Sequence, residues 1–232
     1  MKTISCALQK KNEEETDMKI QDGQRLVMIG DSITDVGRAR PIGEGKGDAL
    51  GRGYVSLVDA MLQATYPDRA IRITNMGISG NTVRHLKERW QTDVLDLNPD
   101  WLSVKIGIND VWRQFDSPSM PERSVYIEEY EDTYRELLEK TRSRLKGLVL
   151  MTPYFLEPNK EDPMRKMMDQ YGEVVKKLAA EYDAILVDTQ QAFDEYMKHV
   201  SPLALCADRV HPSLAGHAVI AKAFLNAIGF ER

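Results

Sequence analysis

A serine and a histidine lie in two short motifs at opposite ends of the chain. Ser32 is part of Gly-Asp-Ser-Ile-Thr at positions 30–34, directly after an apolar run, and Asp208 precedes His211 by three residues. A serine hydroxyl attacks a carbonyl only when a base takes its proton, and histidine suits that task. A carboxylate on the second ring nitrogen orients the imidazole and stabilises its charged form. The pattern predicts a nucleophile, a general base and an orienting acid.

Two further stretches supply donors for the negative charge that develops during such an attack. The stretch 75–82, Asn-Met-Gly-Ile-Ser-Gly-Asn-Thr, can present a backbone N–H from a turn that glycine permits. Asn109 follows another apolar run, in Gly-Ile-Asn-Asp, and offers its side-chain amide. Preorganised donors of this kind contribute about 3–4 kcal/mol each in other enzymes.

Strand and helix patterns alternate along the chain without internal repeats. The strand candidates are 26–29, 71–74, 102–106, 147–152 and 184–187. The helix candidates are 54–65, 82–97, 125–145, 164–182, 189–199 and 213–227. This alternation predicts an α/β fold in which right-handed crossovers build a parallel sheet with helices on both faces. The candidate chemical groups then lie at the carboxyl ends of the strands, where ligands bind in open α/β sheets.

The motifs, in this order and at strand ends, resemble the four sequence blocks of the SGNH/GDSL hydrolase superfamily from about Met18 onward. The blocks at 30–35, 77–84 and 106–113 are similar to bacterial intracellular acetylxylan esterases. The resemblance implies a three-layer α/β/α sandwich with a five-stranded parallel sheet in flavodoxin-like order 2-1-3-4-5. It also implies site roles. Ser32, Asp208 and His211 would form a catalytic triad, and the N–H groups of Ser32 and Gly80 with the amide of Asn109 would form the oxyanion hole.

The substrate pocket is less defined than the triad. Asp31, Asn81, Trp112 and Arg113 adjoin the motifs and are predicted to contact substrate, with simple packing as the alternative for Trp112 and Arg113. Relatives in the resembling subfamily tend to carry an aromatic residue before the triad aspartate, whereas this chain has Ala207. That departure leaves the triad intact and concerns the shape of the pocket.

Each motif also has a purely structural explanation when it is taken alone. Gly-Asp-Ser is a favoured turn sequence, His211 and Asn109 can cap neighbouring elements, and Gly80 can fill a left-handed position. Asp35 and Asp110 are either hydrogen-bond partners behind the site or solvated turn residues. The remaining polar candidates are predicted to be structural or to lie in surface loops: His85, His199, His217, the glycine-rich run 43–47 and the irregular stretch 153–163, which can also wall the cleft.

Composition excludes several classes of protein. The formal net charge of −5 over 232 residues argues against a nucleic-acid partner, and no apolar run reaches the length of a membrane span. The two cysteines, Cys6 and Cys206, predict no disulfide framework and suit a cytoplasmic location. No cluster has metal-ligand spacing, so neither a metal nor a cofactor is expected. A homo-oligomer is left open.

The chain is expected to have a polar N-terminal extension, residues 1–17, and a single hydrolase domain, residues 18–232. The expected function is that of a serine carboxylic-ester hydrolase that removes acetyl groups from xylo-oligosaccharides or related sugars. Alternatives on the same framework are a short-chain lipase, a lysophospholipase or a thioesterase. An inactive carbohydrate-binding module is the alternative outside the enzymes.

Overall fold

Five parallel strands form one sheet in the order β2-β1-β3-β4-β5. The computed structural model describes residues 18–231, so the predicted extension 1–17 lies outside the described residues. The strands are β1 Arg25–Gly30, β2 Arg72–Gly77, β3 Trp101–Lys105, β4 Gly147–Met151 and β5 Ile185–Val187. The predicted fold class and the flavodoxin-like strand order are therefore confirmed.

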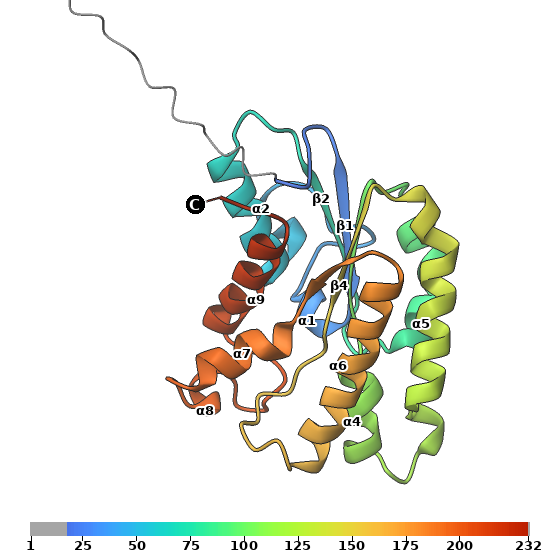
Figure 1. Cartoon of the computed structure of the whole chain (residues 1–232). Coiled ribbons are helices and arrows are strands. Elements are labelled where there is room, and N and C mark those ends of the chain that lie inside the picture. Colours follow the sequence, from blue (N-terminus) through green and yellow to red (C-terminus); the bar gives the residue numbers. More distant parts are fainter. Residues whose placement is uncertain (1–17, 232) are drawn as a thin grey trace, which may run out of the picture.

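Helices cover both faces of this sheet (Figure 1). On one side, α2 Tyr54–Thr65 packs against α9 Leu214–Ala227, which also contacts α7 Thr189–Met197. On the other side lie α3 Val83–Trp90, α5 Ile127–Thr141 and α6 Pro163–Glu181. Shorter helices and turns complete the fold: α1 Ser32–Asp35, α4 Ile108–Asp116, α8 Pro202–Leu205, a π turn at Gln91–Leu95 and 3₁₀ turns at Gly47–Leu50, Pro121–Arg123 and Arg142–Arg144.

The central strands are buried on both faces, as their composition requires. Every residue of Leu26–Ile29 is fully buried, and β3 and β4 are buried throughout. Continuous apolar runs of this kind are typical of parallel sheets covered by helices on both sides. One core of buried side chains runs from Met18 to Ile228.

The register of the sheet brings the ends of three strands to the same level. Gly30 at the end of β1 lies opposite Gly77 of β2 and Lys105 of β3. A Cβ atom on Gly77 would lie 2.3 Å from the backbone nitrogen of Asp35, so only glycine allows α1 to approach β2 so closely. The three motifs that follow these strands therefore meet at one edge of the sheet.

Two segments differ from the sequence-based expectation. The residues after β3, which lie outside every predicted helix, form helix α4, whose apolar positions 108, 111, 112 and 115 have helical spacing. The run 43–47, predicted to be a flexible surface loop, is anchored at its start. Gly43 exchanges two backbone hydrogen bonds with Asn75, and Glu44 forms an ion pair with Arg25.

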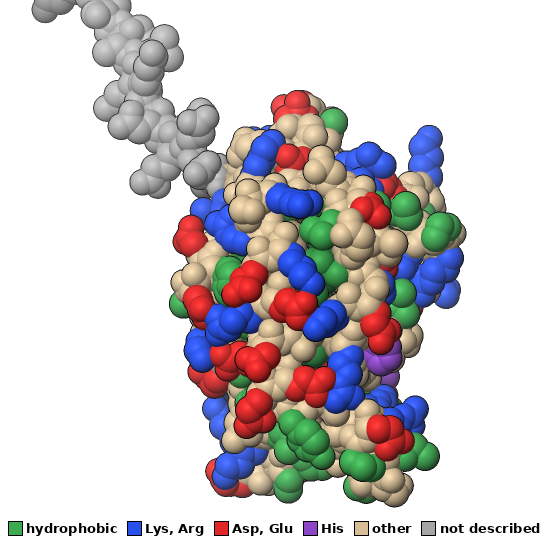
Figure 2. Space-filling model, turned by 90° about the vertical axis from the view of Figure 1, so that its right-hand side faces the viewer, with side chains coloured by type: hydrophobic (Ala, Val, Ile, Leu, Met, Phe, Trp, Pro, Cys, Tyr) green, Lys and Arg blue, Asp and Glu red, His purple; other side chains and the backbone are tan. Residues whose placement is uncertain are grey.

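Charges of both signs alternate over the face that carries α5 (Figure 2). Lys87 and Lys140 each lie 2.6 Å from Glu136, and Lys177 lies 2.7 Å from Glu131. Exposed pairs of this kind contribute at most about 1 kcal/mol each. In the described part of the chain, no helix combines the length and the apolar character needed to cross a bilayer.

Candidate active site

The structure brings together three predicted residues from opposite ends of the chain. Ser32, the first residue of α1, has its Oγ 2.9 Å from Nε2 of His211. On the other side of the ring, Nδ1 of His211 lies 2.7 Å from Oδ2 of Asp208. This is the connectivity that general-base activation of a serine requires. The Asp208 side chain is 43% exposed, so the acid of the triad is only partly buried.

The loop that carries Asp208 and His211 is held by the segment that follows β4. The backbone N–H of Leu156 donates to the carbonyl of Arg209 at 3.0 Å, and the Tyr154 hydroxyl donates to the carbonyl of Val210 at 3.0 Å. An ion pair of 2.5 Å joins Arg209 to Glu157. The start of the stretch 153–163 therefore positions the acid–base pair, which is a more specific role than that of a cleft wall.

Asp208 is surrounded by donors that stabilise its charge. Oδ1 accepts hydrogen bonds from the backbone N–H groups of Val210, at 3.0 Å, and His211, at 2.8 Å. The thiol of the buried Cys206 donates to the same oxygen at 2.8 Å. Partial burial opposes ionisation, but these donors and the His211 ring outweigh it and hold the pKa of Asp208 well below its ordinary value. The carboxylate therefore stays ionised across the range in which an esterase works.

We expect the contact between Cys206 and Asp208 to affect both the pKa of the thiol and the catalytic rate. Burial and the neighbouring carboxylate raise the pKa of the Cys206 thiol to about 11, so Asp208→Asn should lower it. Thiolate absorbance against pH in a Cys6→Ala background measures this change. Cys206→Ala should lower kcat roughly tenfold, the equivalent of one charge-assisted hydrogen bond, and Cys206→Ser should restore it. An unchanged pKa of the Cys206 thiol in Asp208→Asn would contradict the contact.

Each of the three predicted oxyanion donors has a hydrogen that the fold leaves available. Ser32 begins α1, so its N–H has no acceptor within the helix. Gly80 adopts the left-handed φ of +80° in an exposed turn, and no atom lies within 4 Å of the position that a Cβ would take. The amide of Asn109 donates to the carbonyl of Asn81 at 3.0 Å with one hydrogen, which leaves the second hydrogen for a ligand, while Arg113 donates to its Oδ1 at 3.1 Å. These groups can bind an oxyanion.

The turn that contains Gly80 is clamped from both neighbouring motifs. Asp35, which ends α1, accepts a hydrogen bond from the N–H of Ser79 at 3.0 Å. Asp110, next to Asn109, accepts one from the N–H of Val83 at 2.9 Å. The sequence allowed two roles for these carboxylates, as hydrogen-bond partners behind the site or as solvated turn residues. Both are buried and bind the turn, so the first role applies.

The clamp at Asp110 predicts a pH dependence of stability. Burial raises the pKa of Asp110 to about 7, although the bond from Val83 opposes that shift. The unfolded chain ionises this carboxyl at lower pH, so its contribution to folding is fully present below pH about 4 and is lost as the pH rises to about 7. Asp110→Asn keeps an acceptor and cannot ionise. Relative to that variant, the free energy of unfolding of the wild type, measured in urea, should fall by about 2–3 kcal/mol between pH 5 and pH 8. A difference in the free energy of unfolding between wild type and Asp110→Asn that stays constant from pH 5 to pH 8 would contradict the raised pKa of this carboxyl.

A buried pair of opposite charges that sequence reasoning did not identify lies behind the nucleophile. Asp31 caps α1 by accepting from the N–H of Ile33, and Lys105 ends β3; both are at least 99% buried. Burial raises the pKa of Asp31 and lowers that of Lys105, and each group opposes the shift of the other. Among the described residues neither Oδ2 of Asp31 nor Nζ of Lys105 has a hydrogen-bond partner. A lysine in an otherwise apolar strand was the available signal.

The predicted substrate contacts divide into two groups. Asp31 is fully buried and Asn81 is 8% exposed and bound to Arg89, so these side chains support the backbone rather than face a ligand. Trp112 is half-buried, and its ring centre lies 5.9 Å from that of His211. Arg113 stacks on Trp112 at 5.0 Å besides orienting Asn109. Ala207 is exposed next to Asp208.

The other histidines lie outside this constellation. His217 is buried and accepts from the N–H of Tyr54 at 3.3 Å. Burial, together with Lys105 and His211, lowers the pKa of His217 to about 4, so it stays neutral near pH 7. His85 completes the capping box of α3 with Thr82. No group of three potential metal ligands occurs within residues 18–231.

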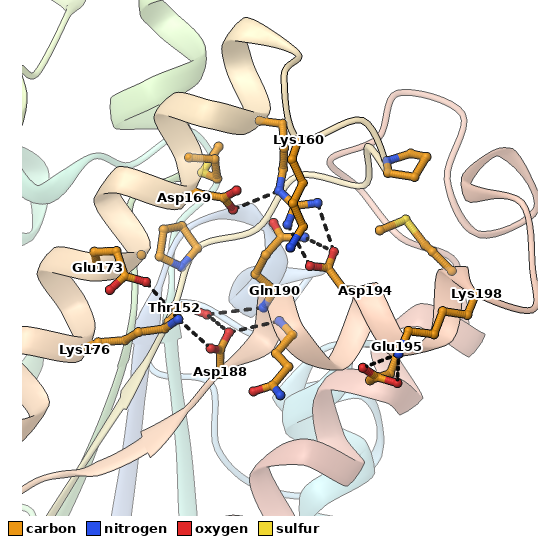
Figure 3. A pocket seen from close by; sticks show the side chains of 17 residues that line it. Thr152, Lys160, Asp169, Glu173, Lys176, Asp188, Gln190, Asp194, Glu195 and Lys198 are labelled. Carbon is orange, nitrogen blue, oxygen red and sulfur yellow. Dashed lines mark hydrogen bonds and ion pairs between the residues drawn. The ribbon is translucent and has the colours of Figure 1, made fainter.

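A cavity of about 730 Å³ opens between α6 and α7, and none of the predicted site residues lines it. Its charged side chains largely pair with one another (Figure 3). Arg165 binds Asp194 at 2.7 Å, and Lys176 lies 2.9 Å from Asp188. Paired charges leave few groups free to recognise a ligand, so the candidate active site remains the triad edge of the sheet.

Residues 28–219 match the model of the GDSL-like Lipase/Acylhydrolase family, and the chain belongs to that family. An acetylxylan esterase of Geobacillus stearothermophilus is 58% identical over 214 residues, which cover 92% of this chain and 98% of the relative. The solved structure of Axe2, an acetylxylan esterase from the same organism, has a TM-score of 0.91 at 58% identity and covers 92% and 97% of the two chains. LAE5, an enzyme from the metagenome of Lake Arreo, has a TM-score of 0.90 at 54% identity, covering 91% and 98%.

Further Axe2 structures carry alanine at a serine, an aspartate and a histidine that are described as catalytic. The separations between these three positions equal those between Ser32, Asp208 and His211. Another Axe2 structure replaces a tryptophan directly before the catalytic aspartate, at the place that Ala207 occupies here. The two chains therefore share the spacing of the triad and differ beside it.

Proposed function

We propose that this protein is a serine esterase that removes acetyl groups from acetylated xylo-oligosaccharides. The observation that carries the proposal is the triad of Ser32, His211 and Asp208, with its 2.9 and 2.7 Å contacts, in a chain 58% identical to an acetyl-xylooligosaccharide esterase with the same catalytic spacing. A shared catalytic spacing at this level of identity supports a shared reaction more strongly than a shared fold does.

The geometry supports an acyl-enzyme mechanism. Oγ of Ser32 attacks the acetyl carbonyl while Nε2 of His211 takes its proton, and Asp208 stabilises the imidazolium. The new oxyanion lies between the N–H groups of Ser32 and Gly80 and the amide of Asn109. The C–O bond to the sugar breaks, the leaving alkoxide takes the proton from His211, and acetyl-Ser32 remains. Water, deprotonated by His211, then attacks this ester; the bond to Oγ of Ser32 breaks, His211 returns the proton to Oγ, and acetate leaves.

A short-chain lipase or thioesterase is the second candidate, and one observation favours it. Leu203 is 69% exposed in α8 and Leu214 is 63% exposed at the start of α9, so exposed leucines flank the triad loop in the sequence. Exposed apolar side chains at a catalytic edge suit a longer acyl chain. Against this, the cavity that adjoins Gly80 is lined mainly by charged and polar side chains, which suit a sugar.

A panel of acyl lengths separates the two candidates. We expect acetyl esters to be hydrolysed with a kcat/KM about tenfold higher for every methylene that a small acyl pocket cannot hold, within the roughly 1–3 kcal/mol that one methylene discriminates. Acetylated xylo-oligosaccharides should be substrates, and octanoyl esters of the same alcohol should be almost inert. Equal or faster hydrolysis of octanoyl esters would favour the lipase and thioesterase alternative.

Two further expectations belong to this proposal. A cytoplasmic location would restrict the enzyme to short fragments that have entered the cell, which suits oligosaccharides rather than polymer. A homo-oligomer would place copies of this chain side by side, and sedimentation of the purified protein measures whether it forms.

A further inference from the structure

A cavity of about 370 Å³ adjoins the oxyanion donors, and its role is not set by the triad. Gly80 and Arg113 line it together with residues at the start of α3 and with Glu122 and Arg123 of the 3₁₀ turn Pro121–Arg123. Its volume lies within the range of about 300–1,000 Å³ that small-ligand sites occupy. The cavity therefore begins where the carbonyl oxygen of an ester would be bound.

Several polar groups around this cavity are not used by the fold. Within residues 18–231, the carboxylates of Glu88 and Glu122 form no ion pair or hydrogen bond, and the guanidinium of Arg123 contacts only the sulfur of Met120, at 3.7 Å. His85 uses Nδ1 to cap α3, which leaves Nε2 free. Carboxylates accept hydrogen bonds and guanidinium groups donate them. A sugar hydroxyl both donates and accepts, so this set matches a hydroxyl-rich ligand.

The position of the cavity indicates which part of an ester it would hold. Gly80, one of the predicted oxyanion donors, lines the cavity, and no atom lies within 4 Å of the position that a Cβ on it would take. An acyl chain would leave the charged groups without partners, and burying unpaired polar groups is costly. The alcohol side of the ester carries hydroxyls and meets no such penalty.

We propose that this cavity is a sugar subsite that holds the xylose unit next to the acetylated one. The inference rests on the proposed function, because it assigns the neighbouring unit of that substrate. Glu88 and Glu122 accept hydrogen bonds from its hydroxyls, and Arg123 donates to them. Arg113 lines the cavity and also donates to Asn109 at 3.1 Å, so an occupied subsite reaches the oxyanion hole through one side chain. The enzyme then prefers acetylated oligosaccharides to acetylated monosaccharides.

The test compares substrates of different length on the full-length protein. The kcat/KM values are measured for acetylated methyl xyloside, acetylated xylobiose and para-nitrophenyl acetate. The wild type should hydrolyse the xylobiose ester at least tenfold better than the monosaccharide ester. The double variant Glu88→Ala/Glu122→Ala removes both acceptors, so it should lose most of this advantage and keep its activity on para-nitrophenyl acetate. Both side chains are exposed and unpaired, so the variant should fold.

Glu128→Ala is the matched control, because Glu128 is an exposed and unpaired carboxylate of α5 that does not line the cavity. It should keep the preference for xylobiose. Equal rates of the wild type on both sugars, or a preference that survives the double variant, would overturn the subsite and leave the proposed function standing. Hydrolysis of para-nitrophenyl acetate without hydrolysis of any acetylated xylose would overturn both.

Discussion

Ser32→Ala should lower kcat for ester hydrolysis by about 10⁴–10⁶-fold, because the attacking atom is lost. His211→Ala should cost a similar factor, and the double variant should cost no more than either single change, since the members of a triad act as a unit. Steady-state rates on an acetyl ester measure all three variants. Residual activity of Ser32→Ala within tenfold of the wild type would exclude Ser32 as the nucleophile.

The control for this experiment is stability. The Oγ of Ser32 contacts Nε2 of His211 and supports no core packing, so Ser32→Ala should leave the midpoint of urea unfolding nearly unchanged. A surface change such as Ser213→Ala, in the residue before α9, should alter neither the rate nor the stability appreciably. A large loss of stability in Ser32→Ala would mean that the rate effect reports misfolding.

The second large effect is expected at the oxyanion hole. Asn109→Ala removes a donor that is used most strongly in the transition state, so kcat should fall about 10²–10³-fold while KM changes little. Asn226→Ala, an exposed position on α9, is the matched control and should keep full activity. A change confined to KM would place Asn109 in ordinary substrate binding.

Asn109→Ala also removes the bond to the carbonyl of Asn81, so the Gly80 turn loses one of its anchors. The bonds from Ser79 to Asp35 and from Val83 to Asp110 remain. The turn should therefore keep its conformation. Hydrogen exchange of its backbone amides measures whether it does, and faster exchange there would assign part of the rate loss to the turn.

Much of the fold could be predicted because its elements depend on local pattern. Apolar runs such as 26–29 are long enough to predict buried parallel strands, and the order of the motifs along the chain predicts that their ends meet. Helix α4 is absent from the predicted helices, because Gly-Ile-Asn-Asp was interpreted only as the motif that presents Asn109. The helical spacing of its apolar residues from Ile108 to Phe115 was present in the sequence.

The supporting contacts could not be predicted, because they join residues that are distant in the sequence. Lys105 is unusual as a lysine in a buried strand, but the sequence does not indicate that its partner in charge is Asp31. Tyr154 holds the triad loop 56 residues further on, and that bond depends on how the two segments pack. The contact from Cys206 to Asp208 is local, but a cysteine two residues before an acid does not by itself predict a hydrogen bond between them.

The distance along the chain between the nucleophile and its base has a kinetic consequence. Ser32 and His211 are 179 residues apart, and their contact forms only after the first strand and the last helices have come together. Contacts of high sequence separation form slowly, because the loop between them must close first. Helical structure should therefore return early during refolding, and ester hydrolysis should return late. The rate at which hydrolysis of a chromogenic ester returns during refolding would therefore report when the first strand and the last helices have come together.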